Sequence, residues 1–213
     1  MTFRRLVKTG AVLALATAAT LATATTADAH GRRPAPGTRS LATVLAADGS
    51  GFDRKPFDYD VLDNAVTAVL TAKPTSPVAV LADGDTALTA FLPTDQAFRQ
   101  LAADLIGHHY RSESKVFTVL ATELGVDTIE WVLLYHVVPG ATISYRQALR
   151  SDGADLTTAL PVATVEVDVR RPFVKLVDAD RDARNPLVVA PDLNARNVQI
   201  GHGIDRVLRP VDL

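Results

Sequence analysis

The chain has 213 residues, 47% of them hydrophobic and 22% charged, which is typical of a folded domain and not of a disordered chain. Its 22 basic and 24 acidic side chains give a formal net charge of −2, so it lacks the basic excess of a nucleic acid binding protein. Cysteine is absent, which excludes disulfides, thiolate nucleophiles and thiolate-bound metals. We therefore predict no nucleic acid partner and no cofactor.

Residues 1–29 are typical of an export signal. Basic residues near the start precede a run of apolar and small residues, and Ala-Asp-Ala at 27–29 fits a signal peptidase site. The run is too short and too rich in threonine to span a membrane. We predict cleavage after Ala29 and a product without a membrane span, either secreted or associated with the cell envelope. A pair of arginines keeps the twin-arginine export route as an alternative to the general route.

Residues 30–40 are rich in proline, glycine and arginine, a composition that predicts a flexible linker. One folded domain is expected over residues 41–213, and its oligomeric state stays open. The many alanines, and arginine in excess of lysine, favour a bacterial source.

The first half of the domain has helical periodicity interrupted by short apolar runs. Apolar residues recur every three to four positions over 58–73, which predicts an amphipathic helix. Residues 78–81 and 88–92 are apolar runs on either side of an Asp-Gly-Asp turn, which predicts two strands.

Three helices are expected next, and each has a residue suited to begin it. Thr94 can cap the first helix and Ser112 the second. The spacing Asp127–Glu130 resembles a capping box for the third helix, and Ser144–Gln147 repeats that pattern before a short fourth one.

After Gly153 the apolar period changes from nearly four to two. This pattern predicts strands over 165–169, 173–177, 187–190 and 198–208. Helices gathered early and strands gathered late indicate an α+β domain with an antiparallel sheet.

Two histidines are expected in the core and two on the surface. His136 lies in an apolar run, and His202 lies between two glycines of a strand. We interpret both as neutral, hydrogen-bonded core residues, with a catalytic base as the alternative for His136. Charging them on unfolding would lower stability below about pH 6. His108 and His109 are adjacent in an expected loop, where a solvated position is favoured over metal ligation.

One acidic turn has alternating oxygen donors: Asp178, Asp180, Asp182 and Asn185. It does not match an EF-hand, because Ala183 occupies the position that needs glycine and Val189 the position that needs glutamate. We interpret it as a solvated turn, and we keep a weak calcium site as the alternative.

The sequence has no nucleophile elbow, phosphate loop, zinc-protease helix or dinucleotide fingerprint. We predict that the protein is not an enzyme. Two alternatives remain open: an extracellular hydrolase that uses His108 or His109 with Asp104, and a small-ligand carrier with an apolar pocket.

Three segments resemble, in order, the signatures of the fasciclin domain, an extracellular adhesion module. They are 89–98 (TAFLPTDQAF), 134–140 (LYHVVPG) and 198–210 (VQIGHGIDRVLRP). We expect a structural role for the signature residues Phe91, Pro93, Thr94, Asp95, Phe98, Tyr135, His136, Pro139, His202, Asp205 and Arg206. Pro93 fixes a strand-to-helix corner, and Asp205 and Arg206 are suited to pair with each other.

The resemblance implies a wedge-like β-sandwich of antiparallel strands with a packed cluster of helices and no enzymatic activity. The implied partner is an extracellular protein or a cell-envelope polysaccharide. In some animal members the Tyr-His segment has been linked to integrin recognition, but Tyr135 and His136 are expected to be buried here. Inserted stretches at 48–55, 105–113 and 178–191 are the loops best placed to distinguish a ligand.

Overall fold

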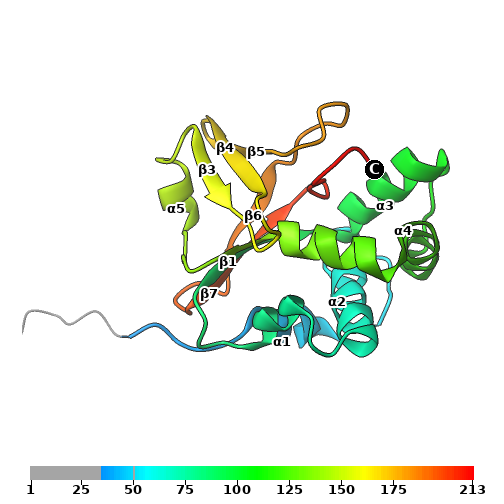
Figure 1. Cartoon of the computed structure of the whole chain (residues 1–213), viewed down its shortest axis with the longest axis horizontal. Coiled ribbons are helices and arrows are strands. Elements are labelled where there is room, and N and C mark those ends of the chain that lie inside the picture. Colours follow the sequence, from blue (N-terminus) through cyan, green and yellow to red (C-terminus); the bar gives the residue numbers. More distant parts are fainter. Residues whose placement is uncertain (1–34, 50) are drawn as a thin grey trace, which may run out of the picture. The chain divides into compact units, whose positions relative to one another are not determined.

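The computed structural model describes residues 35–49 and 51–213 (Figure 1). The predicted signal peptide lies outside the described residues. Within the predicted linker, Gly37 already pairs with Asn197 in a β-bridge, and its N–H donates to the carbonyl oxygen of Arg196 at 2.8 Å. The chain therefore makes β contacts with the domain before Leu41, the residue at which the sequence predicted the fold to start.

The helices include those predicted from the sequence, in the same order, and a short one after Ser40 that was not predicted. They are α1 (Leu41–Leu45), α2 (Asp60–Ala72), α3 (Asp95–Ile106), α4 (Glu113–Tyr135) and α5 (Tyr145–Ala148), with 3-10 helices η1 (Ala46–Asp48) and η2 (Pro77–Ala82). The Thr94 hydroxyl caps α3 by accepting from the N–H of Ala97 at 3.3 Å, and Ser144 with Gln147 forms a capping box at α5. Both caps confirm the sequence prediction.

Helix α4 contains the second and third of the helices predicted from the sequence. Gly125 interrupts it with φ 71° and ψ 165°, a conformation that favours glycine. The Asp127 and Glu130 carboxylates, predicted as part of a capping box, instead both pair with the ammonium group of Lys73 just after α2. This shared cation joins the second half of α4 to the end of α2.

The strand predicted at 78–81 is wrong, because these residues form η2. Pro77 supplies a helical φ at the first position, and the Ser76 hydroxyl accepts from the N–H of Val78 at 3.3 Å. A short apolar run does not by itself distinguish a buried strand from a buried helical turn.

Seven strands form two sheets in the described part of the chain. They are β1 (Leu88–Pro93), β2 (Val137–Pro139), β3 (Ala154–Thr157), β4 (Thr164–Arg170), β5 (Phe173–Val177), β6 (Val188–Leu193) and β7 (Gln199–Ile204). One sheet has the order β2-β1-β7-β6 and the other β3-β4-β5. All pairings are antiparallel except that of β1 with β7, which is parallel. The sequence interpretation had expected antiparallel pairing throughout.

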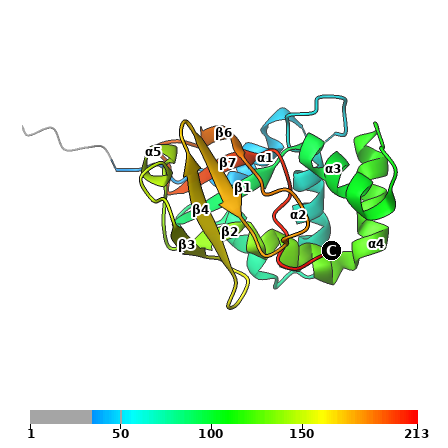
Figure 2. The same cartoon turned by 90° about the horizontal axis from the view of Figure 1, so that it is seen from above.

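The core has two parts that meet at the central strands. All six residues of β1 and of β7 are buried, as expected for strands covered on both faces. One apolar cluster joins the helices, and the other fills the space between the sheets. Close packing also explains Gly201, since a Cβ there would lie 2.6 Å from Cδ1 of Leu92. Figure 2 shows the helices α2, α3 and α4 gathered at one end of this unit and the sheets at the other.

Candidate functional site

Most signature residues are buried parts of the scaffold. Those buried are Phe91, Pro93, Thr94, Asp95, Phe98, Tyr135, His136 and His202. Pro139 is exposed at the end of the edge strand β2, a position where proline is tolerated. The Tyr135 hydroxyl donates to the carbonyl oxygen of Thr164 at 2.9 Å and joins α4 to β4. With Tyr135 fully buried, the Tyr-His segment does not form an exposed recognition site.

The pair predicted between Asp205 and Arg206 is not the one formed. The Asp205 carboxylate accepts from the N–H of Leu187 at 2.6 Å and lies 3.4 Å from the guanidinium of Arg184. Arg206 instead lies 3.7 Å from the carboxylate of Asp104. Neighbours at the end of a strand point in different directions, so each side chain pairs with a partner from another segment.

Both core histidines are held as neutral rings by backbone groups. At His136, Nδ1 donates to the carbonyl oxygen of Val132 at 2.6 Å, and Nε2 accepts from the N–H of Leu208 at 2.9 Å. At His202, Nδ1 accepts from the N–H of Asp192 at 3.2 Å, so Nε2 donates to a carbonyl oxygen. A second proton on either ring would have to go on the accepting nitrogen, where it would point at a backbone N–H group. Burial lowers the pKa of His136 to about 4 and also lowers that of His202.

We expect His136 to make the domain less stable in acid. Its pKa is near 6.5 when unfolded and about 4 when folded, so its contribution is present above pH 6.5 and is lost as the pH falls toward 4. Between pH 7 and pH 5 this removes about 2 kcal/mol from the free energy of unfolding. Urea unfolding at the two pH values checks it, with His136→Gln, which cannot titrate, as the comparison. An equal pH effect in both proteins would contradict the assignment.

A surface groove of about 970 Å³ lies between the second half of α4, the turn joining β3 to β4, the loop after β5 and the C-terminal segment. Its apolar members include Trp131, Val162 and Val211, with 58%, 104% and 53% of their surfaces exposed. We call this surface the Trp131 groove. Large apolar side chains exposed together are typical of a binding face.

The charged lining of the Trp131 groove is mainly acidic. It contains four carboxylates and one guanidinium, from Asp155, Glu166, Asp178, Asp180 and Arg181. The Asp178 carboxylate accepts from the N–H of Arg209 at 2.9 Å, while its second oxygen is buried without a hydrogen-bond partner. Burial raises the pKa of Asp178 to about 6, and repulsion from Asp180 adds to this.

The acidic turn that the sequence singled out forms one wall of this groove. Asp180 is 2% exposed, and its Oδ1 accepts from the N–H groups of Asp182 and Ala183 at 2.9 and 3.2 Å. Its Oδ2 pairs with Arg209 at 3.2 Å. Among the described residues, the carboxylate groups close enough to hold a cation together do not include this turn. The calcium site kept as the alternative for this turn stays a prediction.

A family model describes this architecture. The fasciclin domain model matches residues 62–210. The chain belongs to the fasciclin domain family. A solved FAS1 domain pair from the insect cell adhesion molecule fasciclin I matches with a TM-score of 0.50 and 15% identity, covering 73% of this chain and 48% of that one. The chain therefore spans about half of that structure, and the likeness concerns the fold. No curated protein matches the sequence.

Membership of the fasciclin family confirms the predicted α+β wedge and supports a non-enzymatic, adhesion-type module. None of the helices in the described part combines the length and apolar character needed to cross a bilayer.

The residues proposed for a hydrolase do not form a catalytic pair in this fasciclin domain. His108 and His109 are exposed, and the ring of His108 packs edge-on against Tyr110 with centroids 4.5 Å apart. The Asp104 carboxylate pairs with Arg206 and Arg209. A base positioned by a carboxylate, as an acyl-transfer site requires, is not assembled from these residues.

The apolar cavities beside the two core histidines are too small to hold a carried ligand. They measure about 30 Å³ beside His136 and about 20 Å³ beside His202. Pockets for drug-sized ligands measure roughly 300–1,000 Å³. The Trp131 groove has such a volume, but it is an open surface that suits a segment of a larger partner.

Proposed function

We propose that this fasciclin domain is an exported adhesion module whose Trp131 groove binds a basic segment of an extracellular protein. The observation that carries the proposal is the exposed ring of Trp131 in a groove whose charged lining is mainly acidic. Tryptophan is enriched among the residues that dominate protein interfaces, and its face attracts arginine and lysine side chains.

The charges support a basic partner over an acidic one. Asp155 and Glu166 are exposed at the groove, where they are suited to steer a cationic segment toward Trp131. Val162 and Val211 provide apolar contact area beside the ring. Export is supported by residues 1–29 of the sequence, and an exported protein that begins at His30 would bear it out.

A cell-envelope polysaccharide is the competing partner, and parallel peptide and glycan arrays separate the two. Wild-type chain and Trp131→Ala are applied to both arrays at physiological salt. We expect wild type, and not the variant, to select peptides rich in arginine or lysine together with aliphatic residues. Selection of acidic peptides, of glycans alone, or of the same spots by both proteins would contradict the proposal.

A further inference from the structure

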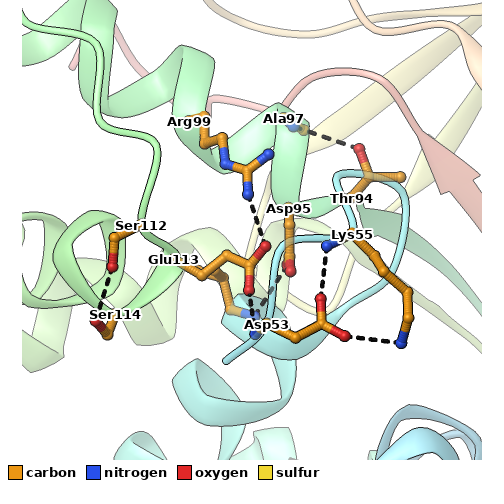
Figure 3. A network of polar contacts seen from close by, with 10 residues as sticks. Asp53, Lys55, Thr94, Asp95, Ala97, Arg99, Ser112, Glu113 and Ser114 are labelled. Carbon is orange, nitrogen blue, oxygen red and sulfur yellow. Dashed lines mark hydrogen bonds and ion pairs between the residues drawn. The ribbon is translucent and has the colours of Figure 1, made fainter. Parts of the chain in front are cut away.

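A second group of acidic side chains lies where the loop 53–58 meets the first residues of α3 and α4. Asp58, Asp95 and Glu113 each place a carboxylate oxygen within 4.8 Å of the others. Figure 3 shows Asp95 and Glu113 at the starts of their helices, with Asp53 beside them. These residues are not part of the Trp131 groove.

Several of these oxygens have no partner within the described structure. Asp95 is 0% exposed, and its Oδ1 accepts from the N–H of Val61 at 3.0 Å, while Oδ2 is buried without a hydrogen-bond partner. Both carboxylate oxygens of Asp58 are likewise buried and unpartnered. Buried polar atoms are rarely left without a partner in folded proteins. Three such oxygens in one acidic cluster therefore favour a cation as the ligand of this cluster.

The cluster is held in place by contacts around it. Glu113 is 0% exposed, and its two oxygens accept from the guanidinium of Arg99 at 2.7 Å and from the N–H of Asp53 at 2.6 Å. The carbonyl oxygen of Asp58 accepts from the N–H of Asp95 at 3.0 Å. A ligand would thus meet carboxylates that the backbone already brings together.

Charge and spacing indicate the class of ligand. Three carboxylates beside the single guanidinium of Arg99 leave an excess of two negative charges, which a divalent cation offsets. Calcium binds oxygens at about 2.3–2.6 Å, so two of its ligands are separated by up to roughly 4.8 Å, whereas magnesium needs a tighter octahedron.

We propose that Asp58, Asp95 and Glu113 bind one calcium ion, which ties the loop 53–58 to the starts of α3 and α4. Asp53 is left out of the ligand set because its carboxylate pairs with Lys55 at 2.7 Å near the surface. Extracellular calcium modules bind with dissociation constants of about 10⁻⁴ to 10⁻³ M, and we expect an affinity in that range.

Calorimetric titration of the full chain with calcium chloride, after removal of metals with EDTA, tests the site. We expect the wild-type chain to bind one ion. In Asp58→Asn the affinity should be at least about tenfold lower, because the ion loses one charged ligand. Asp85→Asn removes the same charge from an exposed position and should bind as wild type does. At ten times the dissociation constant, calcium should raise the Tm of wild type by about 3–6 °C, and that of Asp58→Asn by much less.

Two outcomes would overturn the proposal. If calcium gives neither heat nor a Tm shift in wild type, the three carboxylates do not bind the ion. If Asp58→Asn binds as wild type does while Asp180→Asn loses binding, the ion belongs to the acidic turn at the groove. Asp58→Asn removes a negative charge from an acidic cluster and breaks no hydrogen bond of the side chain. We therefore expect this variant to remain folded in EDTA, and circular dichroism checks that it does.

Discussion

Arg209→Met is expected to destabilise the domain by about 3–5 kcal/mol, the typical cost of removing one partner of a buried ion pair. Arg209 is 7% exposed, and its guanidinium pairs with Asp180 at 3.2 Å and also with Asp104. Methionine keeps most of the apolar stem but leaves the Asp180 carboxylate buried without its cation. Urea unfolding followed by circular dichroism at pH 7 measures the loss.

Two further variants make this result specific. Adding Asp180→Asn to Arg209→Met removes the uncompensated charge and should recover a large part of the lost stability. Arg184→Met breaks a pair whose arginine side chain is 61% exposed, and it should cost no more than about 1 kcal/mol. A stability of Arg209→Met within 1 kcal/mol of wild type would show that the buried pair does not hold the C-terminal segment.

Trp131→Ala is expected to weaken binding of a groove partner by at least about 30-fold, which corresponds to roughly 2 kcal/mol, the size typical of a tryptophan at the centre of an interface. The same change should alter folding stability little, because the side chain is 58% exposed. Affinity is measured with the basic peptides selected on the array, by surface plasmon resonance.

Phe173→Ala is the matched control, since Phe173 is 54% exposed and lies outside the groove. It should bind the peptides as wild type does. Trp131 is also the single tryptophan of the chain, so its fluorescence should shift to shorter wavelength as a peptide covers it. Equal losses in both variants, or binding without a change in emission, would place the contact elsewhere.

Local sequence signals predicted much of the fold. The periodicity over 58–73, the hydroxyl of Thr94 and the pair Ser144–Gln147 each specify a helix from neighbouring residues alone. The parallel pairing of β1 with β7 was not predictable in this way, because it joins strands from opposite ends of the domain. Strands as short as β2 are likewise too brief to show a period.

The candidate sites were harder to predict than the scaffold. The sequence singled out the acidic turn but not Trp131, because the exposure of one ring on a helix depends on which distant segments pack beside it. The approach of Asp58, Asp95 and Glu113 depends on how the loop crosses two helix starts. Such sites combine segments that are distant in sequence, so their members have no common motif.

Hydrogen exchange of the full chain with and without a selected basic peptide tests most directly the claim that the Trp131 groove is the binding face. We predict slower exchange over 160–166 and 177–185, two of the segments that line the groove, and no change over 48–55 and 105–113. Slower exchange confined to those other two loops, with the groove unaffected, would contradict the claim.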